Sequence, residues 1–151
     1  MRTVWRLCAA RHAATAMSGH GARLYGGRWN DRGVAMIYCS GTLSLAVLEL
    51  LVHSPVLPTG MVAIQIDLPD SVGVDVWPAS TLPTGWRATP APARLQTIGS
   101  AWVRRGTAVA LEVPSAIVEV EHNVLLNPAH PDLGRLVVHR PRPFPFDARS
   151  K

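Results

Sequence analysis

The stretch from residue 34 to residue 53 constrains the fold more than any other part of the chain. VAMIYC at 34–39 is rich in the residues that favour strands, and Ser40-Gly41-Thr42 supplies turn and helix-capping residues. An apolar run follows from Leu43 to His53 and stops at Ser54-Pro55, where proline ends a helix. The sequence therefore predicts a strand that leads through a tight turn into a helix.

One acid, Glu49, lies inside this predicted helix. Leucine and valine residues surround the helix axis, so we expect the helix to be largely buried, with Glu49 on a narrow stripe beside Ala46 and His53. A buried, unpartnered carboxylate costs on the order of several kcal/mol. Glu49 therefore either pairs with His53 or a core arginine, or faces a cleft where small Ala46 leaves room for a ligand. The residues alone leave both readings open.

A second segment, Ser18–Gly33, combines glycine with arginine. It holds five of the chain's 12 glycines, so we expect a loop whose backbone turns tightly or lies close to another group. Arg23, Arg28 and Arg32 lie in the same segment, and guanidinium groups beside exposed backbone N–H groups suit a phosphate or diphosphate. The spacing matches neither a P-loop nor a Rossmann glycine motif, and a solvated surface loop is the alternative.

The remaining chain reads as short strands with few helices. A helix is expected at Ala93–Arg105, ending at Gly106, and a Pro-rich stretch, Trp77–Pro92, is expected to be an ordered loop or flap. Further strands are predicted at Thr3–Cys8, Met61–Leu68, Val72–Trp77, Thr107–Val113, Ser115–Val120 and Leu136–His139. Strands and helices do not alternate regularly, which favours an α+β fold over a parallel doubly wound sheet.

Composition and cysteine content limit the class of protein. With 151 residues and 48% hydrophobic content, the chain can fill one core, so we expect a single domain over residues 1–151. The start shows no secretory signal, and the longest apolar run is far too short to span a bilayer. Cys8 and Cys39 are isolated, so buried reduced thiols in a cytoplasmic protein are expected. The histidines and cysteines form no metal-binding motif.

The net charge of +5 raises nucleic acid as a partner. The cations are 14 arginines and Lys151, but they are dispersed along the chain and no known nucleic-acid motif appears. A basic nucleic-acid-binding module without catalytic activity is therefore kept as a competing hypothesis. This hypothesis assigns no role to Glu49, the one acid in the predicted helix.

Several segments, taken in order, resemble the RES family of bacterial toxins. They are Trp5-Arg6, GGRWN at 26–30 followed by Gly33, IYCS at 37–40, LAVLELLVH at 45–53, IGSAW at 98–102, VPSAIV at 113–118 and NPAH at 127–130. RES proteins are named for Arg, Glu and Ser residues and are paired with helix-turn-helix antitoxins of the Xre type. The most specific part of the resemblance is the order of GGRWN, a tyrosine strand and a glutamate helix.

The resemblance implies an α+β fold like that of ADP-ribosyltransferases, with mixed or antiparallel sheets, a few helices and an activity that consumes NAD. It implies that Arg28, Tyr38 and Glu49 are catalytic. It further implies that NAD contacts Arg6, Gly27, Arg28, Tyr38 and Ser115, and that no metal takes part. An Xre-type antitoxin is the implied partner, neither a membrane nor nucleic acid is expected as one, and self-association is left open.

The implied function is that of the toxin of a type II toxin–antitoxin system, which cleaves the nicotinamide–ribose bond of NAD and depletes it by hydrolysis or phosphorolysis. Mono-ADP-ribosylation of a cellular protein is the alternative. The sequence does not choose among water, phosphate and a protein side chain as the acceptor of ADP-ribose.

Overall fold

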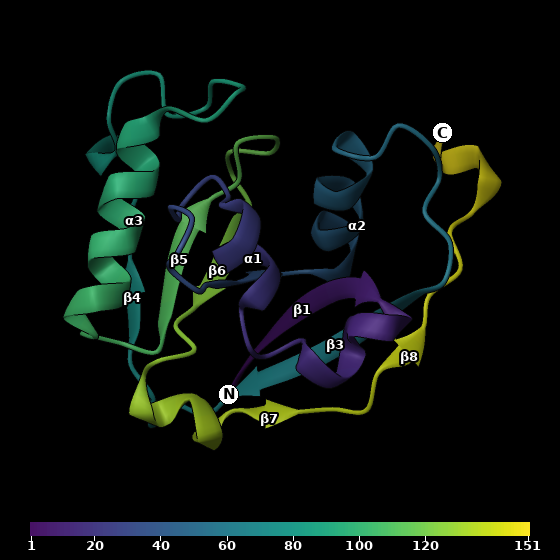
Figure 1. The fold of residues 1–151 in the computed structure, drawn as a ribbon, viewed down its shortest axis with the longest axis horizontal. Helices are drawn as coiled ribbons and strands as arrows, with labels where there is room; N and C mark the ends of the chain where they lie inside the picture. The colour runs from purple at the N-terminus through teal and green to yellow at the C-terminus, as the bar shows by residue number, and fades with distance from the viewer.

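One mixed sheet organises the chain in a computed structural model that describes residues 1–151 (Figure 1). The strand order is β4-β5-β6-β2-β1-β3-β7, and β8 also pairs with β3. All paired strands are antiparallel except β4 and β5, which run parallel. The strands are β1 (Arg2–Ala9), β2 (Ile37–Ser40), β3 (Met61–Leu68), β4 (Val74–Val76), β5 (Ala110–Pro114), β6 (His122–Leu126), β7 (Val137–Val138) and β8 (Arg142–Pro143).

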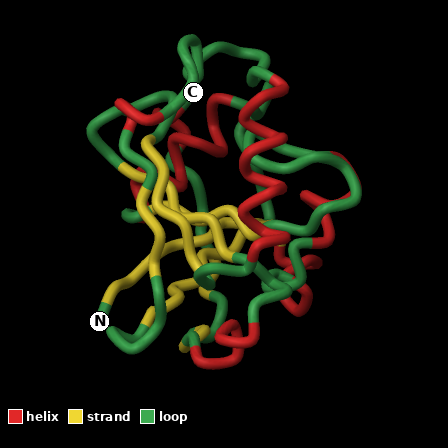
Figure 2. The backbone as a smooth tube through the Cα atoms, turned by 90° about the vertical axis from the view of Figure 1, so that its left-hand side faces the viewer, coloured by secondary structure: helices red, strands yellow, loops and turns green.

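Three α-helices and four short 3-10 helices surround this sheet (Figure 2). Thr42 caps the N-terminus of α2 because its hydroxyl accepts a hydrogen bond from the Leu45 amide. The helices are α1 (His20–Tyr25), α2 (Leu43–Val52), α3 (Ala93–Arg105), η1 (Ala10–Thr15), η2 (Ala79–Thr81), η3 (Pro131–Arg135) and η4 (Ala148–Ser150). The expected strand–turn–helix unit is therefore present, and its capping residue, Thr42, lies within the predicted segment Ser40-Gly41-Thr42.

Alternation along the strands divides the core into two apolar clusters, one on each face of the sheet. In β6, Val124 and Leu126 belong to the first cluster, whereas Leu125 between them belongs to the second. Helix α3 packs Leu95 and Trp102 into the second cluster. The second face therefore carries α3, and the same face holds the side chain of Tyr38.

The sheet is weakly joined at its middle. Only Trp5 and Ser40 are paired between β1 and β2, whereas eight residue pairs join β1 to β3 and four join β2 to β6. The guanidinium of Arg6 enters this seam and donates from Nη1 to the carbonyl oxygen of Tyr38 at 3.1 Å. Because a single residue pair joins β1 to β2, the side chain of Arg6 on β1 reaches the backbone of β2.

The α+β class, the strands at Thr3–Cys8 and Met61–Leu68 and the helix at Ala93–Arg105 are confirmed. Residues 127–130 form a turn, in which the Asn127 side chain accepts a hydrogen bond from the Ala129 amide. Both cysteines are buried and free, as expected.

Three predictions for residues 18–53 were wrong. Residues 18–33 are not all loop, because the short helix α1 forms between Gly19 and Gly26, whose positive φ angles bound it on both sides. The following strand begins at Ile37 rather than Val34. Helix α2 is half-exposed rather than largely buried, since only Leu45 and Ala46 of its residues are buried.

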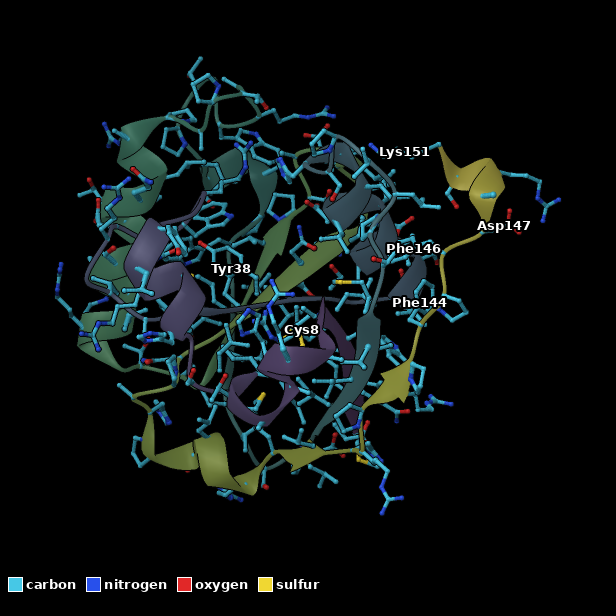
Figure 3. All side chains as sticks on the ribbon, turned by 45° about the vertical axis from the view of Figure 1, so that its right-hand side comes forward. Cys8, Tyr38, Phe144, Phe146, Asp147 and Lys151 are labelled. Atoms are coloured by element: carbon cyan, nitrogen blue, oxygen red, sulfur yellow. The ribbon has the colours of Figure 1, made fainter.

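The prediction of a strand at Ser115–Val120 was also wrong. Its β-branched residues form a turn, because the Ser115 hydroxyl accepts hydrogen bonds from the Ile117 and Val118 amides. The strand lies later, as β6. The strands expected at Val72–Trp77 and Leu136–His139 shrink to β4 and β7, and β8 forms within the Pro/Arg-rich tail. This tail runs along the outside of the molecule, with Phe144 and Phe146 in edge-to-face contact (Figure 3).

Candidate functional site

A pocket of about 470 Å³ lies over the seam between β1 and β2, bounded by α1, α2 and the loop after α1. Five of the residues singled out from the sequence line it: Arg6, Gly27, Arg28, Tyr38 and Glu49. The sixth, Ser115, is fully buried behind Glu49 and does not line the pocket. The structure therefore brings together residues that are up to 109 positions apart in the chain, counted from Arg6 to Ser115.

Glu49 projects from half-exposed α2 and is held by neutral donors. Its Oε1 accepts hydrogen bonds from the Ser115 hydroxyl at 2.8 Å and from the Asn123 amide group at 2.7 Å. Its Oε2 makes no hydrogen bond to the protein. Of the two alternatives that the sequence left open, pairing of Glu49 with His53 or a core arginine is absent, because no ion pair involves this carboxylate. Glu49 is thus oriented without having its negative charge neutralised.

Ser115 holds the Glu49 carboxylate through its hydroxyl group. Its hydroxyl accepts from the Ile117 and Val118 amides at 3.1 Å each and donates its single proton to Glu49. A hydroxyl has one donor and two acceptor positions, so the three hydrogen bonds use all of them. Ser115 therefore fixes the carboxylate relative to the turn after β5.

Asn123 is a further residue of the pocket, and it was not singled out from the sequence. This residue lies on β6 opposite Ser40 of β2, accepts a hydrogen bond from the Ser40 hydroxyl at 2.7 Å, and lines the pocket. Its amide group then donates to Glu49. The signal available in the sequence was a polar residue at the start of the apolar run VLL, but the strand there was not predicted and Asn123 had no place in the fold.

Tyr38 of β2 connects the pocket to the glycine-rich segment. Tyr38, labelled in Figure 3, lines the pocket. Its hydroxyl accepts from the Trp29 amide at 3.0 Å and donates to the Asn30 side chain at 2.5 Å. Burial is the main cause that raises the pKa of Tyr38 far above its ordinary value, so the phenol stays protonated. A Cβ on Gly27 would lie 2.6 Å from the Tyr38 hydroxyl oxygen. Glycine at this position lets the segment close on the tyrosine.

Arg28 is held on one side by backbone carbonyls. Its Nη1 donates to the carbonyl oxygens of Trp86 at 2.9 Å and Ala88 at 3.1 Å, both in the Pro-rich stretch. Its Nε and Nη2 make no hydrogen bond to the protein. Burial lowers the pKa of Arg28, and the negative charge of Glu49 opposes this shift. Arg28 therefore presents a free edge of its guanidinium to the pocket.

Arg6 is a second cation at the same pocket. Its Nη1 is bonded to the Tyr38 carbonyl, but its Nε is buried without a hydrogen-bond partner. Burial raises the pKa of the neighbouring Cys39 thiol to about 12, although the charge of Arg6 opposes the shift. The Cys39 thiol is thus protonated, and the charged groups of the pocket are a carboxylate and two guanidiniums.

No group of three or more histidine, cysteine, aspartate or glutamate side chains is placed to hold a metal ion. None of the helices has the length and apolar character needed to cross a membrane.

Comparison with known proteins decides the family. The sequence profile of the RES domain matches residues 3–147. The chain belongs to the RES family. The Prs ADP-ribosylating toxin of Sphingobium sp. is 39% identical to it over 151 residues, which cover 96% of this chain and 94% of that protein. Toxin Res of Yersinia enterocolitica is 38% identical, over 98% of this chain and 99% of its own length.

The fold of this RES-domain toxin also matches a solved structure. A chain of the M. tuberculosis MbcT–MbcA toxin–antitoxin complex superimposes with a TM-score of 0.77 at 19% identity, covering 95% of this chain and 84% of that one. At this identity the likeness establishes a shared fold. The RES family and α+β fold predicted from the motifs are both confirmed.

Proposed function

We propose that this RES toxin binds NAD in the pocket and cleaves its nicotinamide–ribose bond. One observation carries the proposal: Glu49 has one oxygen held by two neutral donors and the other unpaired, in a pocket that also contains two guanidiniums. The pocket, at about 470 Å³, lies in the size range of small-molecule sites. A carboxylate and two guanidiniums in one pocket match a ligand with a cationic ring and a diphosphate.

Glu49 acts on the ribose in this proposal. Cleavage passes through an oxocarbenium-like state, in which positive charge develops on the ribose ring. The unpaired Oε2 accepts a hydrogen bond from a ribose hydroxyl, and the carboxylate stabilises the developing charge. Because Ser115 and Asn123 already hold Oε1, the carboxylate does not reorganise during the reaction.

The arginines and Tyr38 bind the rest of the molecule. The free edge of Arg28 and the guanidinium of Arg6 contact the diphosphate, with Gly27 letting the backbone lie close to it. The ring of Tyr38 contacts the cationic nicotinamide ring through a cation–π interaction. Because its hydroxyl is used by Trp29 and Asn30, Tyr38 contributes its ring rather than a proton.

The acceptor determines the product. A nucleophile forms a bond to the ribose carbon while the electron pair of the carbon–nitrogen bond leaves with nicotinamide, and the nucleophile releases its proton. Water gives ADP-ribose and inorganic phosphate gives ADP-ribose phosphate, and either reaction depletes cytoplasmic NAD. A protein side chain as acceptor gives mono-ADP-ribosylation, a second candidate that is favoured by the name of the Sphingobium relative.

The experiment is NAD turnover by the purified chain, with Glu49→Gln as the site variant and Glu121→Gln as a matched control on an exposed side chain without hydrogen bonds. NAD loss that falls only in Glu49→Gln supports the site. Equal loss in both variants contradicts it. Mass spectrometry of the ADP-ribose product, with and without phosphate and with cell protein, identifies the acceptor.

An antitoxin partner is part of the proposal. A toxin that consumes NAD has to be inhibited in its own cell, and the fold neighbour comes from a toxin–antitoxin complex. We infer that an Xre-type helix-turn-helix antitoxin binds this chain and closes the pocket. Addition of such an antitoxin should abolish NAD loss, and full activity in a stable complex would contradict closure. The competing nucleic-acid hypothesis predicts salt-dependent binding to DNA or RNA by the isolated chain.

A further inference from the structure

The Pro-rich stretch contacts both ends of the candidate site through three consecutive residues, Trp86, Arg87 and Ala88, which we call the strap. The carbonyl oxygens of the first and third accept hydrogen bonds from Arg28. The side chain of the middle one turns the other way. Its Nε donates to the Ala116 carbonyl at 3.0 Å and its Nη2 to the Ile117 carbonyl at 3.3 Å.

The hydrogen bonds of the Arg87 side chain connect the strap to the turn that holds Glu49. Residues 116 and 117 directly follow Ser115, whose hydroxyl holds the Glu49 carboxylate and caps the Ile117 and Val118 amides. Arg87 also forms an ion pair with Glu119 in the same turn, at 3.6 Å. The guanidinium of Arg87 therefore holds the turn that fixes the Glu49 carboxylate.

Trp86 anchors the strap in the core. Its side chain is 8% exposed and belongs to the apolar cluster that contains Trp29, which follows Arg28 in the chain. Arg87, by contrast, is exposed, and a surface arginine adds little to global stability. The strap thus has one buried anchor and two polar links, one to each half of the site.

We propose that the strap sets the position of Arg28 relative to Glu49, and that Arg87 is the positioning residue that links the two. This inference rests on the proposed function, in which Arg28 binds the diphosphate and Glu49 the ribose of one NAD molecule. A diphosphate and a ribose lie at a fixed separation, so a shift of one half of the site moves the ribose away from the carboxylate. Such misplacement reduces the rate even when binding is kept.

Two measurements on Arg87→Ala test the proposal, one of which needs no NAD. We expect faster hydrogen exchange at the Ile117 and Val118 amides with an unchanged melting temperature. We expect kcat to fall about tenfold, as for the loss of one charge-assisted hydrogen bond, and KM to change less than twofold. Arg87→Lys should recover part of kcat. Arg94→Ala, which removes an exposed arginine without hydrogen bonds, is the matched control and should change neither reading.

Unchanged hydrogen exchange at the amides of residues 117 and 118 in Arg87→Ala would overturn the proposed role of the strap. If the wild-type chain consumes NAD, an unchanged kcat in Arg87→Ala would overturn it as well. If the wild-type chain does not consume NAD, the proposed function fails, and the exchange measurement decides the strap separately.

Discussion

Two carboxylates on structured elements of this protein, Asp67 and Glu49, have opposite surroundings. Asp67 on β3 uses both oxygens: Oδ1 accepts from Thr3 and Gln65, and Oδ2 contacts His139 at 2.6 Å. These hydrogen bonds, that of His139 first, lower the pKa of Asp67 to about 2. Glu49 has two neutral partners on one oxygen and none on the other.

The difference separates an acid that serves the fold from the acid that we propose acts on NAD. Asp67 joins β1, β3 and residue 139 next to β7, so its hydrogen bonds stay within the fold. Glu49 keeps an oxygen free, in a pocket with Arg6 and Arg28. An acid with unused hydrogen-bonding capacity in a cleft is a stronger indication of chemistry than its sequence position alone.

The largest expected effect distinguishes these two acids directly. Glu49→Gln keeps the shape of the side chain and removes its charge, so the rate of NAD cleavage should fall by about 100-fold or more. Asp67→Asn should keep the turnover of the folded protein. Rates of NAD loss for the two variants, measured side by side, check the contrast. Loss of turnover in folded Asp67→Asn would mean that both acids belong to the site.

A smaller effect is expected when the support of Glu49 is removed. Asn123→Ala deletes the amide that donates to Oε1 and leaves the Ser40 hydroxyl without its acceptor. We expect kcat to fall about tenfold, because a hydrogen bond to a charged group is lost. Steady-state kinetics of Asn123→Ala and Asn123→Asp check this. The aspartate keeps the acceptor for Ser40 but repels Glu49, so it should be the slower variant, and a faster one would contradict the arrangement.

Replacing Asp67 should change the stability of the folded chain rather than its rate of NAD cleavage. The pKa of Asp67 is lower in the folded chain than its ordinary value of 3.8, so its stabilising contribution is complete above that pH and is lost as the pH falls toward 2. Asp67→Asn should therefore be less stable than wild type at pH 6, and the gap should narrow below pH 4. Chemical unfolding at several pH values measures it. A constant gap would show that packing, not ionisation, is responsible.

The smallest effect is expected from the pocket thiol. Burial raises the pKa of Cys39 to about 12, so the thiolate is scarce at neutral pH. Iodoacetamide at pH 7.5 should leave the folded chain unmodified and its NAD turnover unchanged, while the chain unfolded in urea should react at both cysteines. Mass spectrometry gives the extent of modification. Rapid loss of NAD turnover when the folded chain is treated with iodoacetamide would show that a cysteine thiol takes part in the reaction.

The sequence was enough to place Glu49 and the strand–turn–helix unit, because apolar periodicity and a capping threonine are local signals. It was not enough to identify the partners of Glu49. Ser115 and Asn123 reach it across 66 and 74 residues, and such contacts depend on strand pairing that periodicity does not encode. The role of Arg28 toward the Pro-rich stretch was hidden for the same reason.

The short helix α1 and the turn at 115–121 were misread for local reasons. Glycines at both ends of α1 resemble a loop, and the β-branched residues after Ser115 resemble a strand. In each case a few local hydrogen bonds decide the structure. Composition over a window does not resolve a single turn.

Cleavage of the nicotinamide–ribose bond of NAD by this chain would release nicotinamide, so the amount of nicotinamide released by the purified protein tests the proposed function. We predict one nicotinamide for each NAD consumed, whichever acceptor takes the ADP-ribose, and loss of this release in Glu49→Gln. Wild-type protein that folds, binds NAD and releases no nicotinamide, with phosphate and cell protein present, would contradict the account.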